Sequence, residues 1–378
     1  MFLQDIPAQF ILFFILYGIT GIVPLIASVY LLLRRGNAFA PLVTPPIRLR
    51  RWAASFYAVS ALGHVWWYLF YIYSNDIHSI AYVVIVIFDC VALISTIAGT
   101  LLAMLQDRKR PIWPVFAAII PFAALGVLHI IFPQTHLISI ATIYILTLYV
   151  LFSVYLVFAV RQYGRWLNDN YADLENKKVW LSQVVLLVCM LLFILYALVD
   201  IDTILIYILH FVELVLFGLL LWRVETLQQL DSLPAEQPDS MPQPDTVMEP
   251  EAPAQAQQVA VVPVNIDLSH IEKLLEERCV ATRLYLQHDL SLLQLAQAIG
   301  TNRYYLSQYF SAQGINYNAY INGLRISHFI NRYHEVSGSG QPFTVQQLAS
   351  ESGYHSYSTF GLAFKQRMGE SVTAWMRK

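Results

Sequence analysis

The stretch TVQQLASESGYHSYSTFGLAFKQRM, residues 344–368, decides the fold of the C-terminal part of the chain. Thr344 is followed three residues later by glutamine, the spacing of a capping box that begins a helix. Gly353 can take the left-handed conformation that ends a helix and turns the chain. Ser356 is then placed to cap a second helix, whose apolar face begins at Phe360. The stretch therefore predicts a helix-turn-helix.

The same pattern occurs upstream in SLLQLAQAIGTNRYYLSQYF, residues 291–310. Ser291 again precedes a glutamine by three positions, Gly300 supplies the turn, and Asn302 can cap the second helix. The segment YNAYINGLRISHFINRY, residues 317–333, has a helical pattern and joins the two copies. These features predict an all-helical C-terminal domain with two helix-turn-helix motifs.

The two motifs, the joining segment and the FK..MG.S pattern of residues 364–371 resemble the AraC/XylS family of transcription regulators over about residues 268–377. The resemblance implies double-stranded DNA as the partner, read by residues near the start of the second helix of each motif. The outward positions of those helices are Arg303, Tyr304, Ser307 and Gln308 in the first copy and Tyr357, Ser358, Leu362 and Lys365 in the second. Gly361 and Leu362 stand where the family usually has Ser and Arg, which changes the reading surface of the second copy.

The remainder of the chain has the composition of a membrane protein. Of its 378 residues, 57% are hydrophobic and 13% are charged, and the apolar residues are clustered. Seven apolar runs are long enough to cross a hydrocarbon core, which needs roughly 20 helical residues. The runs cover residues 9–33, 52–73, 79–105, 112–132, 137–160, 179–199 and 203–222. We therefore expect a seven-transmembrane-helix bundle.

The basic residues of the loops predict the orientation of this bundle. They are confined to the loops after the first, third and fifth runs, and the other loops have none. By the positive-inside bias, the N-terminus is outside and the C-terminus is cytoplasmic. We expect a multi-pass protein of the cell inner membrane with its DNA-binding domain in the cytoplasm.

A change of composition separates the two parts of the chain. Residues 231–265 are rich in Pro, Gln, Glu and Asp and contain no Lys or Arg. Such a segment buries too little apolar surface to offset its conformational entropy. We predict a disordered linker over 224–266, between a membrane sensor domain at 1–223 and a DNA-binding domain at 267–378.

Ionisable residues inside the predicted spans are candidates for a signal site, because each costs free energy in hydrocarbon and normally faces the bundle interior. Asp89, His210, Glu213 and His64 are the candidates. His210 and Glu213 are three positions apart on one helix and can meet directly. A buried hydrogen bond between helices is the alternative, and we favour it for His64 and for His129.

Residues at the outer ends of the spans have open interpretations. Asp76, His78, His136, Asp200 and Asp202 are polar loop ends that could also bind a metal ion or sense protons. Trp66, Trp67 and Trp113 are interpreted as interfacial anchors. The outer loops are too short to fold into a domain, so the signal is expected to be small, lipid-borne, a bilayer property or a partner membrane protein.

No cofactor, metal site or enzyme activity is predicted. The three cysteines have no metal-binding spacing, and the common catalytic motifs do not occur. The sequence favours a membrane-anchored one-component transcription regulator, with homodimerisation as an open question. Residues 267–378 hold ten Lys and Arg against eight Asp and Glu, so a receptor whose tail binds a protein is the first alternative. A transporter with a regulatory tail is the second.

Overall fold

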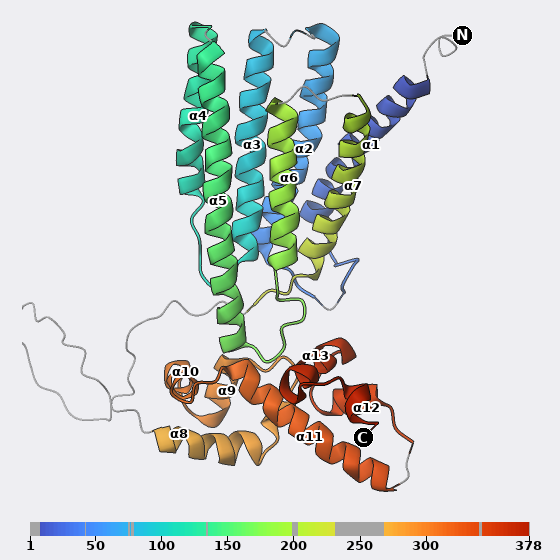
Figure 1. The fold of residues 1–378 in the computed structure, drawn as a ribbon, viewed down its shortest axis with the longest axis vertical. Coiled ribbons are helices and arrows are strands. Elements are labelled where there is room, and N and C mark those ends of the chain that lie inside the picture. The colour runs from blue at the N-terminus through green and yellow to red at the C-terminus, as the bar shows by residue number, and fades with distance from the viewer. Residues whose placement is uncertain are drawn as a thin grey trace, which may run out of the picture. The chain divides into compact units, whose positions relative to one another are not determined.

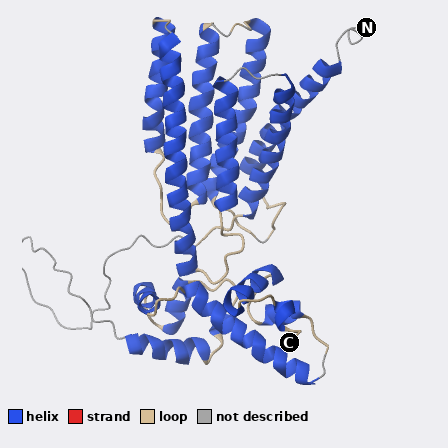
Figure 2. Cartoon of the chain, viewed as in Figure 1, coloured by secondary structure: helices blue, strands red, loops and turns tan. Residues whose placement is uncertain are grey.

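The computed structural model describes residues 8–41, 43–74, 76, 79–133, 135–198, 203–230, 268–339 and 342–377. These residues form helices joined by loops, and no strand occurs among them (Figures 1 and 2). The chain divides into two compact units, the first of Met1–Leu167 with Glu175–Leu230 and the second of Asn168–Leu174 with Asp231–Lys378. The predicted all-α class is confirmed.

Seven helices form the first unit, at the positions of the seven apolar runs. They are α1 (Ala8–Leu33), α2 (Ile47–Tyr73), α3 (Ile80–Met104), α4 (Trp113–Ile131), α5 (Thr135–Asn170), α6 (Trp180–Leu198) and α7 (Thr203–Thr226). Within the described residues, five of them, α1, α3, α4, α5 and α7, are long and apolar enough to cross a membrane. Three arginines lie in the first turns of α2, and the apolar part described for α6 is shorter. Crossing by all seven helices therefore stays a prediction.

The bundle is held together by contacts between neighbouring helices and by hydrogen bonds inside it. Among α1 to α4, each helix packs against the next one in the chain, and α7 packs against α1, α2 and α6 (Figure 1). Tyr57 Oη of α2 donates to Phe217 O of α7 at 2.7 Å, and Ser28 Oγ of α1 donates to Ala54 O of α2 at 2.8 Å. Polar side chains between apolar helices need such internal partners, because lipid offers none.

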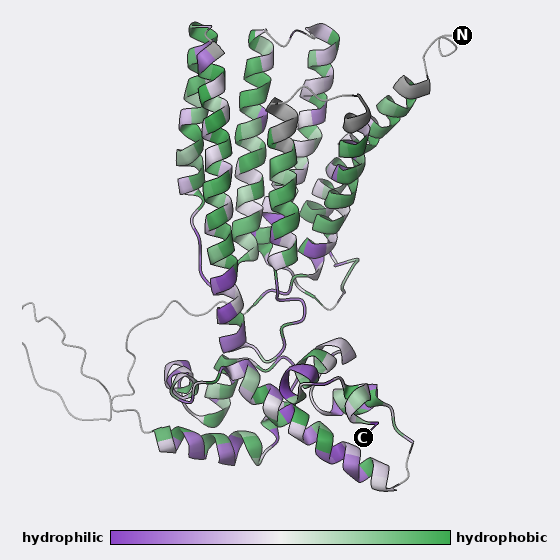
Figure 3. Ribbon diagram, in the orientation of Figure 1, coloured by the Kyte–Doolittle hydropathy of each residue, from purple (hydrophilic) through white to green (hydrophobic). Residues whose placement is uncertain are grey.

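The three basic loops meet at one end of the first unit, beside the end of α7. Asn37 Nδ2, after α1, donates to Glu225 O at 2.7 Å, and Gln106 Nε2, after α3, donates to Gln228 O at 3.0 Å. Gln228 N in turn donates to Asn176 O, in the loop after α5, at 3.2 Å. Figure 3 shows the helices largely hydrophobic along their length and hydrophilic residues gathered at this end. The alternation of basic and non-basic loops therefore corresponds to two ends of one bundle.

The second unit contains seven α-helices and two short helical turns among its described residues. They are α8 (Leu268–Leu275), a π-turn (Glu276–Val280), a 3-10 turn (Leu284–Leu286), α9 (Leu292–Ile299), α10 (Arg303–Ala312), α11 (Tyr317–Ser339), α12 (Val345–Glu351), α13 (Tyr357–Met368) and α14 (Val372–Trp375). The long helix α11 belongs to both halves of this unit, because each half builds a separate apolar core against it.

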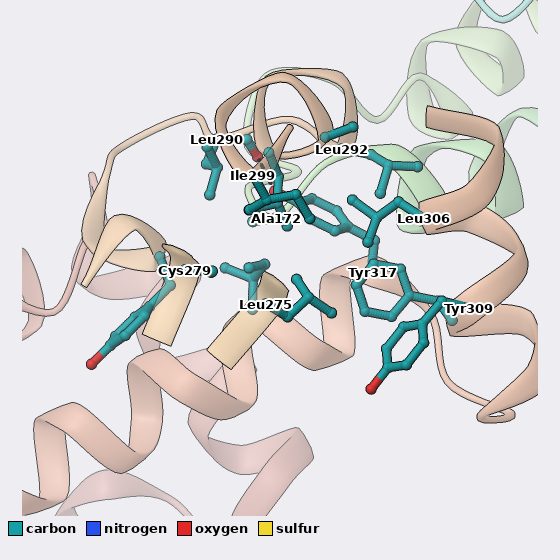
Figure 4. Close-up of a cluster of buried hydrophobic side chains, with 14 of the residues drawn as sticks. Ala172, Leu275, Cys279, Leu290, Leu292, Ile299, Leu306, Tyr309 and Tyr317 are labelled. Carbon is teal, nitrogen blue, oxygen red and sulfur yellow. Dashed lines mark hydrogen bonds between the residues drawn. The ribbon is translucent and has the colours of Figure 1, made fainter. Parts of the chain in front are cut away.

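The first core lies between α8, α9, α10 and the start of α11. Leu275, Leu292, Leu306 and Tyr317 converge there and are almost fully buried (Figure 4). The second core packs residues of α12, α13 and α14 against the latter half of α11. In it Phe329 of α11 lies 4.5 Å from Phe360, between ring centroids. Each helix-turn-helix thus has its own core.

The boundaries of the two units differ from the predicted ones in two places. Helix α7 and the residues up to Leu230 belong to the first unit, seven residues beyond 223. Glu225, in this extension, is fully buried and pairs with Arg34 at 3.0 Å. Asn168–Leu174 belongs to the second unit, which the sequence did not indicate. Most of the predicted linker, together with His78, Asp200 and Asp202, lies outside the described residues.

Candidate functional site

The first helix-turn-helix is formed by α9 and α10, and its caps are those predicted. Ser291 Oγ accepts from Gln294 N at 3.3 Å while Gln294 Oε1 accepts from Ser291 N at 3.0 Å, which completes the capping box. Gly300 has φ of 83°, in the left-handed region. Asn302 Oδ1 accepts from Tyr305 N at 2.8 Å and so begins α10.

The second helix-turn-helix is formed by α12 and α13. Thr344 Oγ1 accepts from Gln347 N at 3.1 Å, but the Gln347 side chain donates to Glu351 at 3.3 Å. Only the first of the two predicted capping-box bonds is seen, because the side chain of Gln347 turns along its own helix instead. Gly353 has φ of 88° at the turn, and Ser356 Oγ accepts from Thr359 N at 3.2 Å.

The candidate DNA-reading residues lie on the outer sides of α10 and α13. Leu306 and Phe310 of α10 and Phe360 and Phe364 of α13 are buried in the cores. Exposed on the opposite sides are Tyr304, Ser307 and Gln308 of α10 and Tyr357, Ser358, Leu362 and Lys365 of α13. An exposed outer face on the second helix of each motif is what major-groove reading requires. Whether these side chains contact DNA stays a prediction.

Arg303, the remaining candidate, is only half-exposed, because a segment of the second unit lies beside it. Its Nε donates to Asn170 Oδ1 at 3.0 Å. The adjacent Ala172 is buried in the first core, and its carbonyl accepts from Asn318 Nδ2 at 2.7 Å. Asn168–Leu174 is more than a hundred residues from Arg303 in the chain, so no local pattern could have indicated this contact.

Arg325 is a structural residue of this domain that the sequence analysis missed. It is fully buried on α11, where Nε donates to Tyr285 O at 2.8 Å and Nη2 to Gln287 O at 2.7 Å. Its guanidinium carbon also lies 5.4 Å from the centre of the Tyr354 ring, in the second half. Arg325 therefore joins the two halves. The available signal was its position four residues from both Ile321 and Phe329, on the apolar face of α11.

The four candidate signal residues of the first unit all line one pocket. Its volume is about 110 Å³, and its walls come from α1, α2, α3, α6 and α7. His64 lies on α2, Asp89 on α3, and His210 and Glu213 on α7. The structure thus brings together residues from three separate helices, although their role in sensing stays a prediction. His129, on α4, is not among the residues that line this pocket.

Hydrogen bonds connect the polar groups of this pocket. His210 Nδ1 lies 3.4 Å from Glu213 Oε2, so the predicted contact along α7 is present. Thr20 Oγ1 of α1 lies 3.0 Å from His64 Nε2 and 3.5 Å from His210 Nδ1. Thr20 was not a candidate, because a threonine in an apolar helix is common and its two histidine neighbours come from other helices.

Asp89 has a different partner in the pocket, the indole of a tryptophan. Trp67 Nε1 donates to Asp89 Oδ2 at 2.5 Å. The polar atom of Trp67 thus has its partner inside the bundle rather than at the bundle end, and its role as an interfacial anchor stays a prediction. Asp76 and His136, at the ends of the spans, are exposed.

Comparisons with known proteins bear on the second unit alone. Residues 295–378 match a family model described as a helix-turn-helix domain. Comparison with curated proteins and with solved structures gives no match. The matched residues run from within α9 through α14 and so include the second helix of each motif, α10 and α13. The C-terminal part of the chain therefore contains a helix-turn-helix domain of the AraC type, which supports a DNA-binding regulatory role.

Proposed function

We propose that the chain is a membrane-anchored one-component transcription regulator, in which a sequence-specific DNA-binding domain is controlled by a seven-helix membrane sensor. The observation that carries this proposal is the presence, in one chain, of two capped helix-turn-helix motifs with exposed outer faces and a bundle of apolar helices. A DNA-binding tail needs the cytoplasm, and the three basic loops lie at the end of the bundle where α7 ends.

The charge of the DNA-binding domain suggests how it selects DNA. Residues 267–378 carry ten Lys and Arg against eight Asp and Glu, so the attraction to phosphates is weak. Because non-specific binding depends mainly on phosphate contacts, most of the affinity must come from base contacts and from paired sites. Such a domain binds best when a second copy is nearby.

Control by the membrane domain follows from this need for two copies. Tethering raises the effective concentration of one DNA-binding domain near another, so association of the membrane domains would strengthen binding to paired half-sites. A signal bound in the pocket of His64, Asp89, His210 and Glu213 shifts that association if it binds the two states with different affinity. The partners of the chain are then DNA, the bilayer, a small signal and a second copy of itself.

A protein-binding tail is the competing function, and two observations favour it. The domain is nearly neutral, and the outer face of α13 exposes Leu362 to 60%, where an apolar residue suits a protein partner. A transporter function has only the intramembrane carboxylates in its favour.

A gel-shift of the full chain in lipid nanodiscs, with DNA from upstream of its own gene, tests the proposal. We expect a shift that unlabelled promoter DNA removes and that an unrelated DNA of equal length does not. The matched control is the same chain with Arg303→Ala and Gln308→Ala, which should lose the discrimination between the two DNAs. Equal binding of both DNAs by the unchanged chain would contradict sequence-specific regulation and favour the protein-binding tail.

A further inference from the structure

Three side chains of the membrane domain have the arrangement of a metal site. One ligand atom from each of His64, His210 and Glu213 lies within 4.8 Å of the other two. In a tetrahedral zinc site with bonds of about 2.0–2.1 Å, ligand atoms are roughly 3.3 Å apart. His210 Nδ1 and Glu213 Oε2 already lie 3.4 Å apart. We propose that these three residues bind one Zn²⁺-like divalent cation, an inference that rests on the proposed function because it names the signal class.

The orientation of His64 fits the role of a ligand. Its Nδ1 lies 2.9 Å from Ser60 O, a carbonyl that can only accept a hydrogen bond. That contact places the proton on Nδ1 and leaves the lone pair of Nε2 directed at the cluster. Metal-binding histidines commonly have such a hydrogen bond on the nitrogen away from the metal, since it fixes the tautomer.

Thr20 completes the site from a third helix. Its Oγ1 lies 3.0 Å from His64 Nε2 and 3.5 Å from His210 Nδ1. The Thr20 hydroxyl also lies 3.0 Å from Leu16 O and 2.9 Å from Tyr17 O, both acceptors, so its proton is directed along α1. With its proton directed so, the hydroxyl oxygen presents a lone pair to the space beside the two histidine nitrogens, where a bound cation would lie. The hydroxyl or a water molecule in its place supplies the fourth position.

The acidic residues of the pocket also favour a bound cation. Asp89 and Glu213 both line it, and its described lining contains no Lys or Arg. Asp89 is 93% buried, and its Oδ1 has no hydrogen-bond partner among the described residues. His210 is 94% buried, and its Nε2 is likewise without one. Two carboxylates in an apolar bundle are neutralised by one divalent cation, which removes most of the cost of burying them.

The donor set selects the class of cation. Two imidazole nitrogens and one carboxylate oxygen suit Zn²⁺ and its transition-metal neighbours, whereas Mg²⁺ and Ca²⁺ need oxygen ligands in larger number. Because the ligands come from α1, α2 and α7, a bound ion ties these three helices together. The metal-free and metal-bound bundles then present different surfaces for association.

The test is a zinc titration of the full chain in nanodiscs, against a chromophoric chelator, after removal of metal. We expect one Zn²⁺ per chain at this site and at least tenfold weaker binding for His64→Gln and for Glu213→Gln. His129→Gln is the matched control within the bundle, since it removes a histidine on α4. His355→Gln controls for the exposed group of Asp173, Asp289 and His355 in the second unit. Both controls should bind zinc as the unchanged chain does. Zinc binding by H64Q and E213Q as tight as that of the unchanged chain would overturn the site.

X-ray absorption of the zinc-loaded, unchanged chain gives an answer that needs no variant to fold. We expect a shell of nitrogen and oxygen atoms at about 2.0–2.1 Å, and a sulfur shell at about 2.3 Å would assign the ion to cysteine and overturn the site. The gel-shift, run with and without Zn²⁺, separates the two proposals. Sequence-specific DNA binding without zinc binding overturns the metal site alone, whereas absence of sequence-specific DNA binding overturns the proposed function.

Discussion

Two arginines of the DNA-binding domain lie in different surroundings, and their roles differ accordingly. Arg325 is fully buried, and burial lowers its pKa below the ordinary value of an arginine. The guanidinium stays charged at neutral pH, since an arginine rarely loses its proton in proteins. It bonds the carbonyls of Tyr285 and Gln287 and lies against the ring of Tyr354. Arg303 is half-exposed at the start of α10, where a recognition helix reaches base edges.

Arg325→Met should destabilise the DNA-binding domain by about 2–4 kcal/mol, because it leaves the buried carbonyl of Tyr285 and the partly buried carbonyl of Gln287 without a donor. Urea unfolding of a fragment of residues 266–378 measures the loss. Arg332→Met is the matched control on the same helix, where the arginine forms exposed pairs with Glu335 and Glu351, and it should unfold at the unchanged urea concentration. Equal midpoints for Arg325→Met and the parent fragment would show that Arg325 does not join the halves.

Arg303→Ala or Gln308→Ala should weaken binding to the cognate DNA by about 1–3 kcal/mol and relax specificity, because each side chain is expected to contact bases. Lys365→Ala should weaken binding to all sequences about equally and reduce the salt dependence, since it is expected to contact phosphate. Titration of each variant with cognate and scrambled DNA at two salt concentrations measures both effects. Unchanged affinity in all three variants would favour a protein partner.

At the scale of the element, the turn of the second helix-turn-helix depends on Gly353. Its φ of 88° disfavours other residues, and a Cβ there would lie 2.8 Å from Leu286 O and 3.0 Å from Arg325 Nε. The turn therefore packs directly on the first half of the domain. The sequence indicated the turn, but the close packing depends on residues far apart in the chain.

Gly353→Ala should lower the stability of the domain by about 1–3 kcal/mol, because it adds backbone strain and a contact with a carbonyl that cannot move freely. Gly361→Ala is the matched control in the middle of α13, where nothing lies within 4 Å of an added Cβ. It should raise stability by about 0.5–1 kcal/mol, since alanine favours a helix. Thermal unfolding of the two variant fragments measures the difference, and a neutral Gly353→Ala would contradict the tight turn.

Features that depend on residues close together in the chain are predicted from the sequence, whereas contacts between residues far apart in the chain are not. Caps at Ser291, Asn302 and Ser356 are local, and the structure confirms them. The seven apolar helices follow from runs of residues, and the structure has them at the predicted positions. The pocket joins residues from separate spans, so the sequence marks its ionisable members one by one but not Thr20. Asn170 and Arg303, which are in contact, are 133 positions apart in the chain, and no sequence pattern around either residue indicates the contact.

At the scale of the whole molecule, the proposal requires that the membrane domain and the DNA-binding domain have separable roles. Asp89→Asn or Glu213→Gln should fix a reporter gene in its on or off state while a fragment of residues 266–378 still binds DNA. Removing about ten residues from 231–265 should change the response little, because a flexible tether acts through effective concentration rather than torque. Loss of the response on shortening the tether would contradict the proximity mechanism. An unchanged response in both substitutions would contradict the signal role of the pocket.

The central claim is that this membrane-bound chain selects particular DNA sequences in the cell. Genome-wide mapping of DNA crosslinked to the full chain tests it most directly, with the Arg303→Ala, Gln308→Ala double variant mapped in parallel. Sequence-specific regulation predicts a small number of discrete peaks that share a repeated half-site and that vanish in the double variant. An identical profile for the two proteins, or the absence of peaks for the unchanged chain, would contradict it.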